Sequence, residues 1–150
     1  MIERFYLNNF PGLESLHDSS TSSVELKDNK LIMYFGHVCA ETEAEEVTKK
    51  HRNLKATYVL NKDFQDEEWC PSVKNINHNK KFVKNAIKYL TLSKFVDALN
   101  NNKCNLRLYE QYYNRNKCML ITELIKEDVL QMGNEFYLEL LIDCIIYEWN

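Results

Sequence analysis

The sequence is short of glycine and proline, and it contains no long apolar run. Its 150 residues include 3 glycines and 2 prolines, which excludes a collagen, a glycine-rich linker protein and a proline-rich adaptor. No run of about 18 apolar residues is present, so the sequence predicts no transmembrane helix and no membrane partner. Residues 1–12 lack a basic segment followed by an apolar one. We therefore expect no secretory signal peptide and a cytoplasmic location.

The three glycines, Gly12, Gly36 and Gly133, are far apart in the chain. A phosphate-binding loop needs glycines close together, because a backbone without Cβ atoms lets a phosphate approach. The sequence also lacks the nucleophile-elbow and dinucleotide-binding motifs. These absences argue against a nucleotide-dependent enzyme, and we predict neither catalytic residues nor a cofactor.

The composition is typical of a single folded domain spanning residues 1–150. Hydrophobic residues make up 45% and aromatic residues 12%, which argues against a disordered chain. A chain of this length buries roughly 70% of its unfolded surface, so it needs no disulfide or metal to fold. The cysteines are odd in number and widely spaced, which favours reduced thiols. They are Cys39, Cys70, Cys104, Cys118 and Cys144.

The net charge of −3 is unevenly distributed along the chain. Residues 1–70 have a net charge of −5, residues 71–117 of +8, and residues 118–150 of −6. We interpret the basic block as a solvated surface that complements its acidic neighbours. Nucleic-acid binding is not favoured, because only 4 of the 19 basic residues are arginine, the residue that makes most base-specific contacts. The 17 asparagines and 15 lysines suggest AT-rich coding, as in a low-GC bacterium.

Alternation of apolar and polar residues predicts several strands. Residues 24–27 alternate, Asp28, Asn29 and Lys30 are turn-forming, and residues 31–35 are apolar on both faces. We therefore predict a β-hairpin within residues 22–38. Residues 54–60 alternate in the same way and predict another strand.

The second half of the chain alternates again. We predict one strand with Leu106, Leu108 and Tyr112 on one side and Tyr109 and Tyr113 on the other. A turn at residues 114–116 and a partner strand at residues 118–125 follow. Residues 135–149 place most apolar side chains at even positions, and we favour a strand although helical spacing is also present. Unbroken, it would span about 50 Å, so we expect a bulge or bend within it.

One main helix is predicted near residues 92–101, with Thr91 as its N-cap. Its apolar stripe follows helical spacing and consists of Leu92, Phe95, Val96 and Leu99. The asparagines at residues 100–102 are expected to end it, because Asn tolerates the left-handed C-cap conformation. With five to seven strands, this gives an α+β, mainly β fold with antiparallel pairing.

Two polar segments are less regular. Residues 41–50 combine the spacing of helical ion pairs with few apolar residues, so a helix and an exposed loop both fit. Residues 61–80 predict a long surface loop.

Histidines and cysteines supply the candidate chemistry. The His17-Asp18 pair resembles part of a phosphohydrolase metal motif, but no histidine precedes it, and we interpret the pair as structural. His37 and Cys39 lie on one face of a predicted strand, yet the sequence has no metal-ligand spacing and we predict no metal. An alternative function is a small enzyme or ligand-binding domain with a pocket near His17, His37 and Cys39, which requires these side chains to converge.

Two acidic clusters are the candidate partner-binding residues, because acidic surfaces steer association with cationic sites. The clusters are Glu41, Glu43, Glu45 and Glu46, and Asp66, Glu67 and Glu68. A solvated surface is the alternative interpretation of both.

Two parts of the chain resemble a group of small bacterial proteins. Residues 16–19 (Leu-His-Asp-Ser) precede the strand, turn and strand of residues 24–35, and residues 145–149 resemble the closing strand of these proteins. Some proteins of this group are immunity proteins encoded beside polymorphic toxins. The resemblance implies stoichiometric binding of a cognate toxin without catalytic residues.

The sequence therefore predicts a non-enzymatic protein-binding domain, a monomer or homodimer, whose partner is another protein such as a toxin. A purely structural homodimer, with the C-terminal strand at a sheet edge, is a further hypothesis.

Overall fold

The computed structural model describes residues 2–6, 16, 18–39, 51–66, 72–74, 91–127 and 129–150, which form eight strands and one helix. The strands are β1 (Ile2–Tyr6), β2 (Ser19–Lys27), β3 (Lys30–Cys39), β4 (His51–Leu60), β5 (Ser72–Lys74), β6 (Cys104–Asn114), β7 (Lys117–Lys126) and β8 (Val129–Trp149). The helix is α2 (Leu92–Asn101). The mainly β fold with one helix is confirmed. The strands outnumber the predicted five to seven, partly because the three residues of β5 are too few to show alternation.

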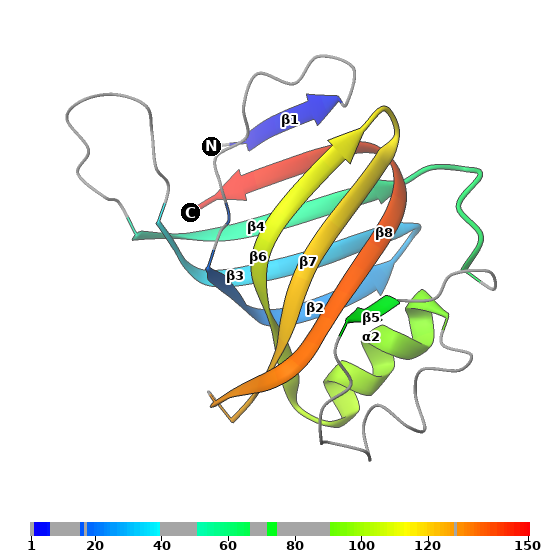
Figure 1. The fold of residues 1–150 in the computed structure, drawn as a ribbon. Coiled ribbons are helices and arrows are strands. Elements are labelled where there is room, and N and C mark those ends of the chain that lie inside the picture. The colour runs from blue at the N-terminus through cyan, green and yellow to red at the C-terminus, as the bar shows by residue number, and fades with distance from the viewer. Residues whose placement is uncertain are drawn as a thin grey trace.

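Six of the strands close into an antiparallel barrel. The order around the ring is β8, β4, β3, β2, β6 and β7, and β7 pairs with β8 to close it. β6, β7 and the first half of β8 form one wall, which crosses the wall of β2, β3 and β4 at a large angle (Figure 1). β1 pairs with residues 144–148 of β8, and β5 pairs with residues 135–137 in its first half. Closure pairs both sides of the ring strands, which limits exposed sheet edges.

β8 passes from one wall of the barrel to the other. It pairs with β7 through residues 129–141 and with β4 through residues 142–149. At the crossing, the Ile142 N–H donates to the Asn116 carbonyl at 2.8 Å. The expected irregularity in this strand is confirmed by register shifts against both neighbours.

The same pairing corrects one hypothesis. The C-terminal half of β8 pairs with β1 on one side and β4 on the other. A homodimer with this strand at an exposed edge is therefore wrong in its premise, because both sides of the strand already have ladder partners.

β2 turns the second corner of the barrel. Ser19 and Ser20 pair with β6, and the following residues pair with β3. At the corner, the Leu106 N–H of β6 donates to the Thr21 hydroxyl at 2.9 Å. The buried side chain thus takes the place of a ladder carbonyl where β2 leaves β6.

The predicted hairpin is β2 and β3. Lys27 pairs with Lys30, so Asp28 and Asn29 form a two-residue loop, with φ of 50° and 59°. Two positive φ values in succession are the type I′ turn that Asp and Asn tolerate. Asn29 Nδ2 donates to the Leu60 carbonyl at 2.9 Å, which ties the turn to the end of β4.

Other local predictions have mixed outcomes. The strands expected at residues 54–60 and 118–125 lie within β4 and β7, and the turn at residues 114–116 joins β6 to β7. Residues 61–80, expected as a loop, contain β5. Residues 41–50 lie outside the described residues.

A bulge in β6 changes which side chains face the interior. Leu108 is buried, but the register shifts between Leu108 and Glu110, and Tyr109 and Glu110 both face outward. Beyond the bulge, Tyr112 is 50% exposed and Tyr113 packs against the core. The prediction that Tyr112 shares the face of Leu108 is therefore wrong, because an extra residue inverts the two-residue period.

The inward face of β8 changes in a similar way. Even-numbered residues from Phe136 to Ile142 are buried, and beyond the crossing the buried residues include Ile145, Tyr147 and Trp149. The alternation predicted from the sequence is correct only as far as the crossing.

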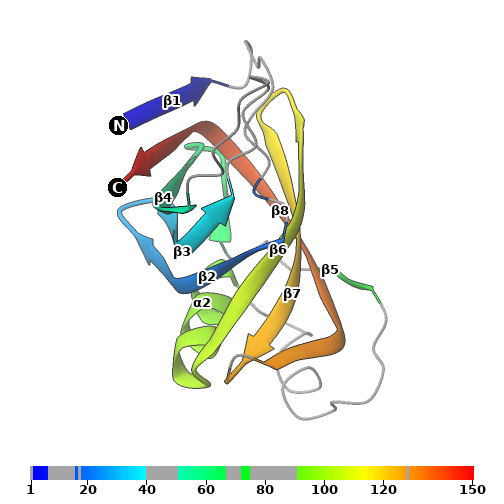
Figure 2. The same cartoon turned by 90° about the vertical axis from the view of Figure 1, so that its left-hand side faces the viewer.

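Helix α2 packs across one end of the barrel (Figure 2). The Thr91 hydroxyl accepts the Lys94 N–H at 3.2 Å, which confirms the predicted N-cap. The predicted apolar stripe is buried along its whole length. Phe95 lies edge-on to Phe136 of β8, with ring centroids 5.6 Å apart, so the helix joins the barrel core.

The C-terminal end of α2 differs from the prediction. Asn102 caps the helix with φ of −95°, and its Nδ2 donates to the Ala98 carbonyl at 2.8 Å. The left-handed residue is Lys103, with φ of 52°. The expected left-handed asparagine is wrong, because the Asn102 amide already satisfies a carbonyl of the last turn.

A hydrogen-bonded cluster crosses the barrel interior. The hydroxyls of Tyr58 and Tyr113 donate to Gln111 Oε1 at 3.0 and 2.5 Å, and Gln111 Nε2 donates to the Tyr147 hydroxyl at 3.5 Å. Burial raises the pKa of Tyr58 well above its ordinary value, so the hydroxyl stays protonated as a donor. The bonds link β4, β6 and β8 and satisfy polar groups that the core would otherwise leave unpaired.

Candidate protein-binding face

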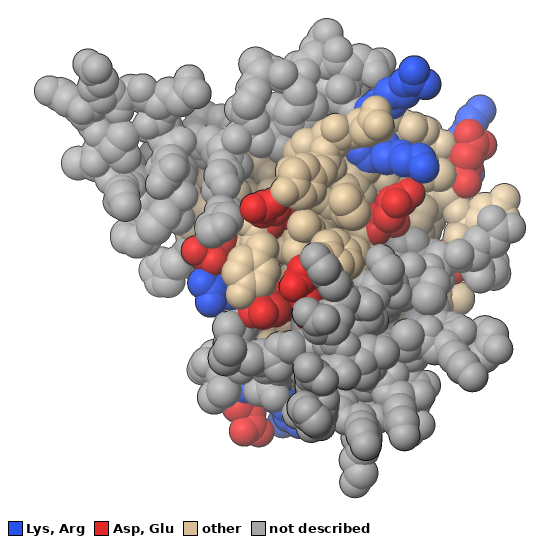
Figure 3. Space-filling view, viewed as in Figure 1, with Lys and Arg blue, Asp and Glu red and all other residues tan. Residues whose placement is uncertain are grey.

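The outer face of β6, β7 and β8 combines carboxylates, tyrosines and apolar side chains. These residues alternate with the buried ones, because successive side chains of a strand point to opposite sides. Acidic side chains are spread among uncharged ones over this face (Figure 3). We name it the acidic–tyrosine face, and it consists of Asp18, Arg107, Tyr109, Glu110, Tyr112, Lys117, Met119, Ile121, Glu123, Glu135, Tyr137 and Glu139.

Tyrosine hydroxyls hold two carboxylates at the centre of this face. The Tyr109 hydroxyl donates to Glu123 Oε2 at 2.6 Å, and the Tyr137 hydroxyl donates to Glu135 Oε1 at 2.7 Å. The bond to Glu123 raises the pKa of Tyr109, because it stabilises the protonated hydroxyl. A carboxylate has about four acceptor sites, so each one is held in position and still has capacity to bind a donor.

Charged residues form a row across three neighbouring strands. Arg107 of β6 lies opposite Glu123 of β7, which lies opposite Glu135 of β8. The row therefore places two carboxylates side by side, with a guanidinium beside one of them. Directly opposed Cβ atoms are about 5 Å apart, and opposed like charges are destabilising.

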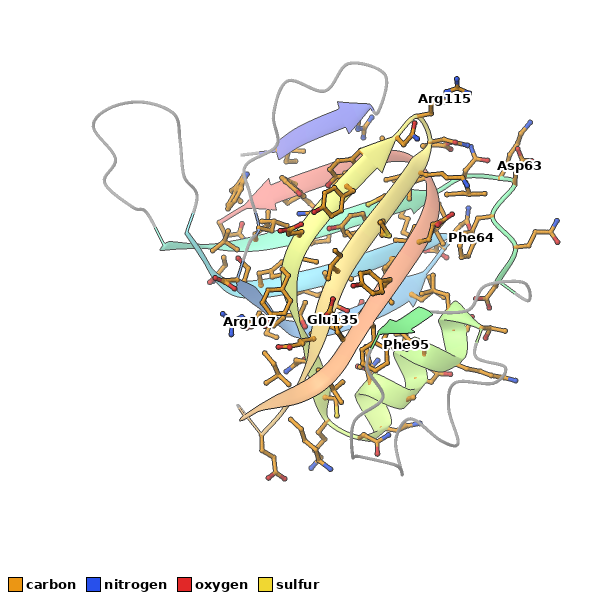
Figure 4. All side chains as sticks on the ribbon, viewed as in Figure 1. Asp63, Phe64, Phe95, Arg107, Arg115 and Glu135 are labelled. Carbon is orange, nitrogen blue, oxygen red and sulfur yellow. The ribbon has the colours of Figure 1, made fainter. Side chains whose placement is uncertain are left out.

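Arg107 shows how this face holds a guanidinium group. Its Nη2 donates to Asp18 Oδ1 at 2.8 Å, and its guanidinium carbon lies 5.4 Å from the centroid of the Tyr109 ring. That distance is within the range of a cation–π contact. Arg107 and Glu135 lie at a similar height on this wall of the barrel (Figure 4).

Apolar and aromatic surface surrounds the charged row. Tyr112 is 50% exposed, and its hydroxyl donates to Glu110 on the same strand. Met119 and Ile121 of β7 are half-buried. Tyrosine, methionine and arginine are enriched at protein interfaces, and this face contains all three.

Of the seven predicted partner-binding residues, the structure describes Asp66. Its Oδ1 accepts the Ser93 N–H at 3.1 Å, and its Oδ2 accepts the Ser93 hydroxyl at 2.5 Å. The half-buried carboxylate thus binds the first turn of α2, where the helix dipole favours a negative charge. The other six lie outside the described residues, and their role stays a prediction; they are Glu41, Glu43, Glu45, Glu46, Glu67 and Glu68.

The alternative pocket near His17, His37 and Cys39 also stays a prediction. His17 and the side chains of His37 and Cys39 lie outside the described part of the chain. In the backbone, Cys39 pairs with His51 at the end of β3. Within the described residues, no group of three His, Cys, Asp or Glu side chains is arranged to hold a metal ion.

Three described cysteines, Cys104, Cys118 and Cys144, are buried free thiols. Burial raises the pKa of each thiol above its ordinary value. Since the thiolate is the nucleophile, these protonated side chains are suited to packing.

A groove on the outer face of β3 and β4 contains an ion pair. Lys55 Nζ lies 2.5 Å from Glu148 Oε2, and the hydrogen bond to Glu148 raises the pKa of Lys55. Tyr34 and Gly36 line the same groove. Because the two charges neutralise each other, the pair is poorly suited to general acid–base chemistry at neutral pH.

The sequence did not point to Glu110, Glu123 and Glu135. These residues are far apart in the chain and come together only through the register of three strands. The alternation of apolar and polar residues in each strand could have indicated which side chains face outward. The bulge in β6 interrupts this alternation.

No protein-family model, curated protein or solved structure matches the chain. Among the described residues, no helix has the length and apolar character needed to cross a bilayer. The case for a function therefore depends on the acidic–tyrosine face.

Proposed function

We propose that this protein is a non-enzymatic bacterial binding domain that neutralises a basic toxin in the cytoplasm. In this proposal the acidic–tyrosine face covers a cationic surface that the toxin needs for its activity. The observation that carries the proposal is the juxtaposition of Glu123 and Glu135, each bonded to a tyrosine on one sheet face.

The opposed carboxylates favour a cationic partner. In the free protein, Glu123 and Glu135 repel each other across the ladder between β7 and β8. A basic side chain placed over both would remove that repulsion and add charge-assisted hydrogen bonds. Binding of a cation would thus relieve the repulsion between the two carboxylates that destabilises the unbound sheet.

The tyrosines supply contact area for such a partner. Tyr109 and Tyr137 are half-buried, held by bonds to carboxylates, while Tyr112 is half-exposed. Tyrosine gives a large contact with few rotatable bonds, so little conformational entropy is lost on binding. Side chains already oriented by Glu123 and Glu135 lower that cost further.

The charge of the face also favours association with a basic protein. Its acidic residues outnumber its basic ones. Lys117 forms an ion pair with Glu139, at 3.2 Å, and this pair does not neutralise Glu123 or Glu135. Electrostatic attraction of this kind raises the association rate and weakens with salt.

The test compares two double variants of the full chain that lose the same charge. E123Q/E135Q neutralises the centre of the face, and E25Q/E127Q neutralises two exposed carboxylates elsewhere. Each protein is immobilised and used to capture binding partners from cells of its source. The captured protein is then identified, and its toxicity is measured in cells that also express each variant.

The expected result is that wild type and E25Q/E127Q retain one basic protein and suppress its toxicity. E123Q/E135Q should lose most of that binding and protection, because the cationic surface no longer has an acidic counterpart. Equal capture and protection by E123Q/E135Q would overturn the proposal, and so would a captured protein with an acidic contact surface.

A further inference from the structure

We propose that the acidic–tyrosine face recognises arginine in preference to lysine on its partner. This inference depends on the proposed function and specifies the chemistry of the partner. The partner guanidinium would bond the carboxylates of Glu123 and Glu135 and lie against the ring of Tyr137.

The face already contains one guanidinium held in this manner. Arg107 combines a carboxylate bond, at 2.8 Å to Asp18, with a tyrosine ring 5.4 Å from its guanidinium carbon. Glu135 and Tyr137 offer the same two groups on β8, a carboxylate and a ring joined by a hydrogen bond of 2.7 Å. Arg107 is therefore an internal example of the contact proposed for the partner.

The charge row explains why shape should matter more than charge alone. Arg107 lies opposite Glu123 in the register. This cation weakens the long-range attraction that the two carboxylates exert on any single positive charge. Discrimination then comes from short-range contacts, in which a planar guanidinium differs most from an ammonium group.

The arrangement of the two carboxylates also fits the planar set of N–H donors on a guanidinium group. Side chains opposed across β7 and β8 project the same way from Cβ atoms about 5 Å apart. A guanidinium presents five N–H donors in one plane and can bond both acids while its face contacts a ring. An ammonium group has three donors and no face, so it gains less from Tyr137.

The experiment uses two defined probes, hexa-arginine and hexa-lysine peptides, which carry the same number of side-chain charges. Their dissociation constants are measured for the full chain by calorimetry at physiological ionic strength. We expect hexa-arginine to bind the wild type about tenfold more tightly. E123Q/E135Q should weaken both peptides, whereas E25Q/E127Q should keep the wild-type values.

A matched pair of variants at Tyr137 tests the contribution of the ring. Y137F keeps the ring and should keep the arginine preference, while Y137L removes it and should bring the ratio close to one. Circular dichroism of both variants establishes that the barrel is folded. Equal affinity of the two peptides for wild type, or an arginine preference that survives in folded Y137L, would overturn the inference.

The outcome separates this inference from the proposed function. If the peptides bind equally but E123Q/E135Q still loses the toxin, the preference for arginine is wrong and the binding face stands. If E123Q/E135Q keeps both the peptides and the toxin, the face itself is wrong and the inference fails with it.

Discussion

Replacing Gln111 by leucine isolates the energy of the interior hydrogen-bonded cluster. Gln111 Oε1 accepts bonds from the hydroxyls of Tyr58 and Tyr113, and a leucine of similar size accepts none. Tyr58 is fully buried, so water cannot replace the lost acceptor at its hydroxyl. We expect the variant to fold and to be clearly less stable.

The magnitude follows from the burial of each hydroxyl. A buried polar group left without a partner costs about 1–3 kcal/mol. Tyr58 carries that cost in full, and Tyr113 adds less because it also hydrogen-bonds Tyr147. Gln111→Leu should therefore lower the free energy of unfolding by about 2–3 kcal/mol. Tyr58→Phe alone should cost about 1 kcal/mol, because Gln111 still accepts from Tyr113.

A double-mutant cycle measures this coupling directly. In the double variant Q111L/Y58F, residue 58 has no hydroxyl left unpaired. Its loss of stability should fall short of the sum of the single losses by about 1 kcal/mol. Urea unfolding of wild type, both single variants and the double variant supplies the four values.

The control combines Gln111→Leu with Tyr109→Phe. Tyr109 bonds Glu123 on the outer face, so its loss should add to that of Gln111 without coupling. The reasoning is refuted if the cycle with Tyr58 is additive, or if Q111L is as stable as the wild type.

Two further predictions concern the end of the helix and the outer face. Asp66→Ala should lower the unfolding free energy by about 1 kcal/mol, because Ser93 loses its capping acceptor. It should leave capture of the proposed toxin unchanged. Urea unfolding and the capture experiment together check this, and a lost partner with unchanged stability would contradict it. NMR titration of the Tyr109 ring should give a pKa above its ordinary value in wild type and a lower one in Glu123→Gln, because the hydrogen bond to Glu123 raises it. A raised pKa in the folded state stabilises at pH values below about 10 and less as pH rises beyond that, so an unchanged titration in E123Q would refute the assigned cause.

Local chemistry made part of the fold predictable. The turn at Asp28 and Asn29 needs two positive φ values, and these residue types tolerate them. The helix near residues 92–101 combines a complete apolar stripe with an N-cap at Thr91. In both places a few neighbouring residues determine the structure, so the sequence contains the whole signal.

Closure of the barrel depends on contacts that no local pattern records. β8 was predictable as a strand, but its partners change at residues 141–142. The pairing of β7 with β8 and of β2 with β6 joins distant segments, and alternation does not specify which strands pair. The sequence therefore indicated an antiparallel, mainly β fold without indicating a barrel.

The candidate face was hidden for a related reason. Contiguous acidic residues such as those at 41–46 are visible in a sequence, whereas Glu123 and Glu135 meet only across a ladder. Asp66, chosen from a contiguous run, bonds the helix through Ser93. Charge clusters in sequence and charge clusters on a sheet surface are thus different sets of residues.

The bulge in β6 joins the interior to the candidate face. Without it, the period that buries Leu108 would place Glu110 inside the barrel and Gln111 outside. A carboxylate in an apolar interior is very costly unless it is paired. The extra residue turns Glu110 outward and brings Gln111 inward, where Tyr58 bonds it.

Because burying the Glu110 carboxylate would be costly, the sequence itself indicates where the bulge must lie. Leu106 and Leu108 establish the inward set, and the next member of that set is Glu110, an acid that this barrel does not bury. An interruption at Tyr109 is the least costly solution, because it exposes the acid and keeps strand pairing on both sides. The same interruption places Tyr109 beside Glu123, so the irregularity that reverses the predicted faces also builds part of the surface proposed to bind the toxin.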